Sequence, residues 1–190
     1  MFTCLAAKVV WQGALDFTLS APNRAVKLEV NGGALPIRLQ TMPMYLDSVL
    51  QGDWNGDRRL DYAIKLAWGG NGIIGDMAVV VFALSAHNGH YALQAIETLT
   101  FDQSALIVSG GKPHVLHVAL VNAQASDKRF HNYFVYTPLE IRGQRLLSSG
   151  RRIWIQYTFS PNSQPARDLS VLEQARAWKA AQPKVFVPLR

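Results

Sequence analysis

The feature that most constrains the fold of this chain is a repeated alternation of apolar and polar residues between turn-forming sequences. Every second residue of Ala25–Val30 is apolar, and Tyr62–Trp68 repeats this period-two pattern of a half-buried strand. Met77–Leu84 is apolar enough for a fully buried strand, and Asn88-Gly89 follows it as a hairpin signal. The pattern predicts a mainly β fold of antiparallel sheets, either sandwich-like or blade-like.

One segment near the C-terminus has helical spacing instead. Val171, Ala175 and Trp178 recur every three or four residues, and Asp168 or Ser170 can cap a helix that starts there. We therefore expect one C-terminal α-helix over residues 168–182. A chain of 190 residues is long enough to bury a substantial core, so we expect a single β domain over residues 1–190 with the helix packed on it.

Composition excludes several classes of protein. An apolar content of 49% with 17% charged residues argues against a disordered chain. No apolar run is long enough to span a bilayer, and Met1–Ala7 is too short for a secretory signal. The single cysteine, Cys4, excludes an intrachain disulfide.

The net charge of +6 belongs to the second half of the chain. Residues 1–100 contain 7 Lys and Arg against 8 Asp and Glu, whereas residues 101–190 contain 12 against 5. No nucleic-acid motif accompanies these cations, so we expect a protein partner with acidic groups rather than nucleic acid. The candidate partner-binding residues are Arg142, Arg145, Arg151 and Arg152. The alternative is that these arginines only protect strand edges from aggregation.

The segment from Asp53 to Asp61 has the ligand spacing of a calcium loop. Side-chain oxygens occupy the first, third, fifth and ninth positions, from Asp53, Asn55, Asp57 and Asp61, and Arg59 can add its main-chain carbonyl. Against this reading, Arg58 stands where such a turn prefers glycine, and two arginines bring positive charge toward the ion. The alternative is a metal-free loop whose carboxylates accept hydrogen bonds from main-chain N–H groups.

The loop Asp53-Trp54-Asn55-Gly56-Asp57, together with Asp61, resembles the calcium loops of FG-GAP/VCBS-like repeat proteins. Three further segments are similar to those of uncharacterised bacterial exported proteins that carry one such loop: Trp68–Gly72, Val79–Ser85 and His131–Tyr136. The resemblance implies a β domain with a structural Ca²⁺ ion and a periplasmic or secreted location. It implies no known activity.

No catalytic motif stands out in the sequence. There is no nucleophile elbow, and we interpret His131 near Asp127 as a structural pair at a strand end. We therefore expect a non-enzymatic binding module, such as a bacterial immunity-type protein that inhibits an acidic secreted toxin. The alternative is a hydrolase of an envelope polymer that uses the loop carboxylates as a catalytic metal site. A closed loop would favour the first, and an open coordination position in a cleft would favour the second.

Overall fold

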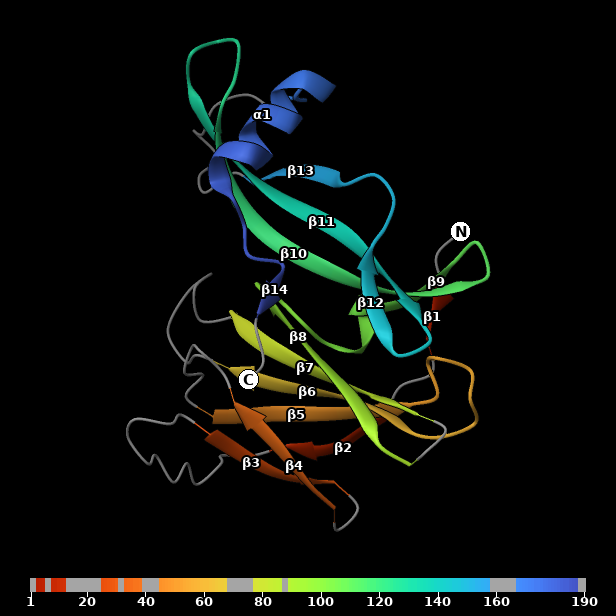
Figure 1. Cartoon of the computed structure of the whole chain (residues 1–190). Coiled ribbons are helices and arrows are strands. Elements are labelled where there is room, and N and C mark those ends of the chain that lie inside the picture. Colours follow the sequence, from red (N-terminus) through yellow and green to blue (C-terminus); the bar gives the residue numbers. More distant parts are fainter. Residues whose placement is uncertain are drawn as a thin grey trace.

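A computed structural model gives the structure of the chain and describes residues 3–5, 8–12, 25–30, 33–38, 45–67, 77–86, 89–157 and 167–187. For residues 8–12, 25–30, 33–38 and 45 it describes the main chain alone. The described part is mainly β, with two antiparallel sheets and one helix near the C-terminus, as the sequence predicts (Figure 1). None of the described helices is long and apolar enough to cross a membrane.

The first of the two sheets, sheet B, is a six-stranded antiparallel sheet that contains the most deeply buried strands. Its strand order is β14-β8-β7-β6-β5-β2. Every residue of the central strand β7 is buried, because its alternate side chains enter two clusters, one shared with the other sheet and one formed with residues of β5, β6, β8 and β14. The bounds are β2 Lys8–Gln12, β5 Tyr45–Gly52, β6 Asp61–Ala67, β7 Ala78–Ser85, β8 Tyr91–Thr98 and β14 Phe186–Val187. A separate hairpin joins β3 Ala25–Val30 to β4 Gly33–Arg38.

The second sheet, sheet A, is built around one long hairpin. Strands β10 and β11 are 13 residues each and pair along most of their length, from His114–Glu140 to Gln124–Phe130. β12 and β13 both pair with β11, while β9 pairs with the first part of β10 and β1 pairs with β9. The bounds are β1 Thr3–Cys4, β9 Leu106–Ser109, β10 Lys112–Gln124, β11 Phe130–Arg142, β12 Arg145–Ser148 and β13 Ile153–Tyr157, with a short 3₁₀ helix η2 at Gln103–Ala105.

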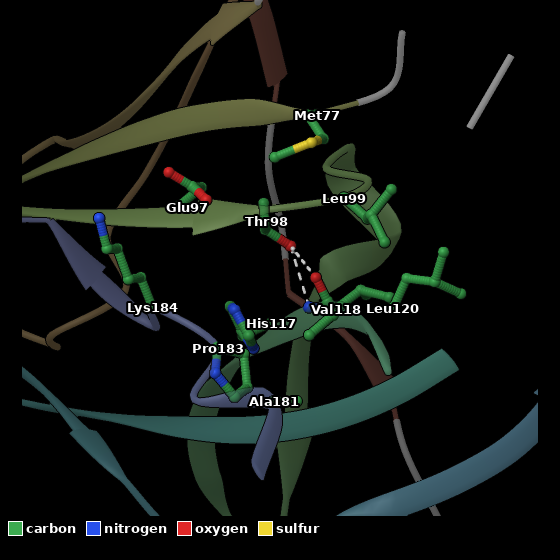
Figure 2. A pocket seen from close by; sticks show the side chains of 11 residues that line it. Met77, Glu97, Thr98, Leu99, His117, Val118, Leu120, Ala181, Pro183 and Lys184 are labelled. Carbon is green, nitrogen blue, oxygen red and sulfur yellow. Dashed lines mark hydrogen bonds between the residues drawn. The ribbon is translucent and has the colours of Figure 1, made fainter. Parts of the chain in front are cut away.

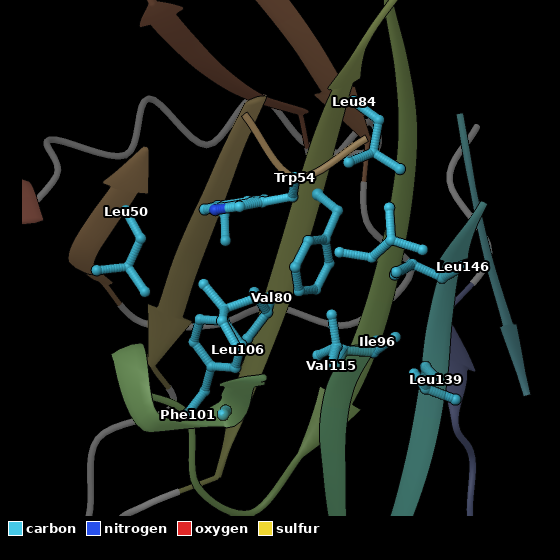
Figure 3. Close-up of a cluster of buried hydrophobic side chains, with 14 of the residues drawn as sticks. Leu50, Trp54, Val80, Leu84, Ile96, Phe101, Leu106, Val115, Leu139 and Leu146 are labelled. Carbon is cyan, nitrogen blue, oxygen red and sulfur yellow. The ribbon is translucent and has the colours of Figure 1, made fainter. Parts of the chain in front are cut away.

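The two sheets share one core. Phe82 of β7 lies between Trp54 and Phe101, with ring centroids at 6.3 and 5.8 Å in edge-to-face geometry (Figure 3). Val115 and Leu139 of sheet A close the same cluster from the opposite side. Because only the first part of β10 packs on sheet B, the far end of the long hairpin needs another cover.

Helix α1, Val171–Ala181, supplies that cover. Ser170 forms a capping box with Glu173, and Gln182 ends the helix in the left-handed conformation. Ala177 and Trp178 pack on a third cluster that includes Val121 and Tyr133, and Figure 1 shows α1 lying over this end of β10 and β11. The helix is shorter by a few residues than the predicted range of 168–182, and Ser170 rather than Asp168 is its cap.

Most predicted strands are present with small shifts in their ends. Ala25–Val30 has the predicted bounds, and β7 is shifted by one residue from the predicted Met77–Leu84. Pro113 of β10 and Pro138 of β11 lie inside strands without ending them. The predicted glycine turn within Trp68–Gly72, and Asn88 of the predicted hairpin turn, lie outside the described residues.

Candidate functional site

The loop between β5 and β6 adopts the turn geometry that its sequence predicts. Asp53 accepts hydrogen bonds from the main-chain N–H groups of Gly56 and Arg58, at 2.9 and 3.0 Å. Asn55 and Asp57 each accept one from the N–H two residues ahead, so the loop is a series of Asx turns. Arg58 has a φ of 65°, the left-handed conformation in which such loops normally carry glycine.

Asp61 has a different role from the other loop carboxylates. It is fully buried, and four donors surround its two oxygens. The N–H groups of Trp54 and Asn55 donate to Oδ2 at 2.7 and 3.0 Å, while Ser85 donates to Oδ1 through its N–H and its hydroxyl at 2.8 and 2.9 Å. Burial raises the pKa of Asp61, and these hydrogen bonds act in the opposite direction. Asp61 therefore ties the loop to the end of β7.

Ser85 is the second anchor of the loop. Its hydroxyl lies 2.9 Å from both oxygens of Asp57, and its carbonyl accepts a hydrogen bond from the Asn55 side chain at 3.0 Å. The Arg59 guanidinium turns to the Ala86 carbonyl, at 2.6 Å. Hydrogen bonds to residues at the end of β7 thus hold the loop in place.

These hydrogen bonds determine how many oxygen lone pairs of the loop are left to bind a calcium ion. Each oxygen of Asp53 accepts one hydrogen bond and keeps a free lone pair, and Asn55 also keeps acceptor capacity. Asp61 keeps less capacity, because three main-chain N–H groups donate to its oxygens and the Ser85 hydroxyl, with its single hydrogen, is shared between Asp61 and Asp57. Within the described ranges, no group of three or more His, Cys, Asp and Glu side chains converges as a metal site. The calcium site thus stays a prediction for this loop.

The four candidate arginines do not lie together. Arg142 and Arg145 face each other across β11 and β12, at one end of sheet A. Arg151 is exposed two residues before β13. Arg152 turns to the other side of the sheet, where its guanidinium lies 3.9 Å from the Trp178 ring centroid. Desolvation lowers the pKa of Arg152, so this side chain belongs to the packing of α1.

The exposed arginines keep a net positive charge at that end of sheet A. Arg142 forms a two-pronged contact with Glu140, at 3.0 and 3.1 Å, and Lys112 binds the same carboxylate at 3.3 Å. Burial alone raises the pKa of Glu140, but the hydrogen bonds from Arg142 and Lys112 outweigh it and hold the pKa below its usual value. One carboxylate thus faces two cations, and Arg145 adds a third.

Next to these cations, one face of sheet A carries an apolar surface that we call the docking face. Residues directly opposite each other on paired strands share a face, which places Leu120, Phe134 and Ile155 in one row. Leu120, Ile153 and Ile155 are 37%, 44% and 50% exposed. The Phe134 and Tyr157 rings meet edge to face at 4.9 Å. The docking face comprises Leu120, Phe134, Tyr136, Ile153, Ile155 and Tyr157.

The opposite face of the same strands is covered. Val135 and its partner Trp154 point toward α1 and are packed with Tyr133 and Trp178. Sheet A therefore has one face buried by the helix and by sheet B, while the docking face has large apolar side chains in contact with solvent. Surfaces of this kind mark interaction sites in soluble proteins.

The predicted pair of His131 and Asp127 is formed. His131 Nε2 lies 2.9 Å from Asp127 Oδ2, and His131 Nδ1 lies 3.4 Å from the Gln156 side chain. His131 is buried, whereas Asp127 lies at the hairpin end with its pKa lowered, chiefly by the main-chain N–H of Arg129. The pair joins β11 to the turn before it.

Together, the fold and these sites define a mainly antiparallel two-sheet β protein with one partly uncovered sheet face. Comparison of the chain with models of protein families, with curated proteins and with solved structures gave no match. The resemblance to FG-GAP/VCBS-like calcium loops stays a prediction.

Sequence reasoning missed Ser85 and the docking face. Ser85 ends an apolar strand 24 residues after Asp61, and nothing in its local sequence marks it as the partner of the loop. The sequence of β13 does contain a signal for the docking face. Ile153, Ile155 and Tyr157 alternate with Trp154 and Gln156, so the strand has apolar residues on both faces, whereas an edge strand with one solvated face normally has polar residues on that side.

Proposed function

We propose that this protein is a non-enzymatic binding module that uses the docking face to bind another protein. The observation that carries the proposal is the apolar docking face beside exposed arginines. Large aromatic and aliphatic side chains at the centre of a surface, with cations at the rim, are typical of protein interfaces. The closed hydrogen-bond network of the Asp53–Asp61 loop supports a structural rather than a catalytic role for its carboxylates.

The chemistry of the partner follows from the same surface. Its contact region presents apolar groups to Phe134 and Ile155 and carboxylates to Arg142, Arg145 and Arg151. A second copy of this chain would bring its own arginines to the interface, and like charges oppose such pairing. An acidic secreted toxin inhibited by an immunity-type protein has the required chemistry, in a periplasmic or extracellular setting.

Pull-down with the products of neighbouring genes tests this proposal. We expect the wild-type chain to retain one stoichiometric partner and Ile155→Asp to lose it, because a carboxylate would be desolvated at the interface centre. Leu172→Asp is the matched control: Leu172 is 60% exposed on α1, away from the docking face. Melting curves check that both variants stay folded. Retention of the partner by Ile155→Asp, or recovery of none by the wild type, would contradict the proposal.

We further propose that Asp53, Asn55, Asp57 and the Arg59 carbonyl hold a structural Ca²⁺ ion, while Asp61 orders the loop without touching the ion. Calcium would neutralise the charges of the loop carboxylates and thereby stiffen the loop. We expect the melting temperature to be higher in millimolar Ca²⁺ than in chelator, and Asp53→Asn to remove the difference. Identical melting curves in the two conditions would rule out the ion.

A further inference from the structure

A groove runs between the free edge of β10 and helix α1, on a side of sheet A that the docking face does not use. One cavity of about 750 Å³ is lined by β10 residues from Asn122 onward and by α1 residues that include Glu173, Arg176 and Ala180. A second cavity, of about 250 Å³, is lined by the preceding residues of β10, up to Leu120, and by Ala181 at the end of α1, together with the end of β8 (Figure 2). We call the two cavities together the edge groove.

The edge of β10 is open along this groove. β9 pairs with β10 only as far as Val115. Val118 shows which main-chain groups point outward, because its N–H donates to the Thr98 hydroxyl and its carbonyl accepts from Leu99 N–H, both at 2.9 Å. Alternate residues of an antiparallel strand share this direction, so Leu120, Asn122 and Gln124 also point their main-chain groups outward.

These outward groups have no partner within the described residues. Val121 and Ala123 bond to β11, whereas the outward N–H and carbonyl groups of Leu120, Asn122 and Gln124 face the groove. Unpaired groups at a strand edge are a template for another strand. Three such residues in alternation present the main-chain donors and acceptors that an extended segment of about five or six residues would pair with.

We propose that the edge groove binds an extended peptide segment of a partner protein, which adds to sheet A as a strand beside β10. The groove walls contain Ala123, Ala177 and Ala180, so they accept small apolar side chains of the segment. Arg176 is exposed at the rim and has no ion-pair partner among the described residues, whereas Glu173 is already engaged by Ser170 and Arg167. The rim therefore selects an acidic residue on the segment.

The groove shares only Leu120 with the docking face. Leu120 lines the second cavity as well as the docking face, whereas Ile153 and Ile155 belong only to the docking face. Ile155→Asp should thus leave peptide binding unchanged. Loss of peptide binding and loss of binding at the docking face can therefore be measured separately.

Selection from a phage-displayed heptapeptide library on the full-length chain tests the inference. We expect enriched peptides without proline at their centre and with one acidic residue, and we expect their synthetic forms to protect the amides of Leu120, Asn122 and Gln124 from hydrogen exchange. Methylation of alternate peptide nitrogens should abolish binding, because it removes the main-chain donors that pair with β10.

A pair of matched variants locates the site. Ala180→Trp fills the groove and should weaken binding by about tenfold or more, whereas Ala175→Trp, an exposed alanine elsewhere on α1, should not. The inference is overturned if no peptide is enriched, if Ala180→Trp leaves the affinity unchanged, or if amide protection falls outside β10.

Discussion

Asp61→Asn is expected to lower the free energy of unfolding by about 3 kcal/mol or more, the largest effect of any single substitution in the loop. An asparagine has one oxygen in place of two, so its amide nitrogen must face two of the four donors that now surround the carboxylate. Those donors are buried, and a buried donor without an acceptor loses its hydration without compensation. Denaturant unfolding measures the change.

Asp53→Asn is the control, because it makes the same chemical change in the same loop at an exposed position. In chelator, Asp53→Asn should lower the free energy of unfolding by less than about 1 kcal/mol, since water can replace the lost acceptor. Ser85→Ala should fall between the two, because it removes one donor to Asp61 and leaves the main-chain donors in place. Equal losses for Asp61→Asn and Asp53→Asn would show that Asp61 is not the anchor of the loop.

Acidification is expected to destabilise the protein through His117. This residue is almost fully buried, and desolvation lowers its pKa from 6.5 to about 4, with a smaller contribution from the nearby Arg152. Because the unfolded state binds the proton more readily between these two values, stability is fully present above pH 6.5 and is lost as the pH falls toward 4. The shift corresponds to about 3 kcal/mol over that range.

The pH effect can be assigned by comparison with His117→Gln, which does not titrate. Glu97, Lys184 and Arg152 lie near the imidazole and remain in both proteins. Asp61 contributes with the opposite sign: its pKa is raised, so its proton favours the folded state at low pH, and this contribution also cancels in the comparison. We expect the stability of the variant to depend less on pH between 6.5 and 4. Parallel stability profiles would contradict the assignment to His117.

The strands and the helix could be predicted from the sequence because their signals are local. Period-two alternation identified β3 and β6, a continuous apolar run identified β7, and helical spacing with Ser170 identified α1. The pairing of β1 with β9 and of β14 with β8, and the cover of the far end of β10 and β11 by α1, could not be predicted. These contacts join residues far apart in the chain, and a single sequence contains no record of such pairs.

In the candidate site, too, local features could be predicted from the sequence and contacts between distant residues could not. The loop conformation, including the left-handed Arg58, follows from a spacing of nine residues and was predictable. The role of Asp61 was not, because its donors include Ser85 from another strand. The four arginines are close in sequence, yet alternation along the chain sends Arg152 to the helix side and leaves the others exposed. Sequence proximity therefore predicted only part of the surface.

Site-specific photo-crosslinking tests the docking face most directly. A benzophenone amino acid is placed at Ile155 in one protein and at Leu172 in another, and each is incubated with the products of neighbouring genes. We predict one stoichiometric crosslinked partner from position 155 and none from position 172, with the yield falling as salt screens the arginines. Crosslinking from position 172 alone, or from neither position, would contradict the assignment of this face as the binding surface.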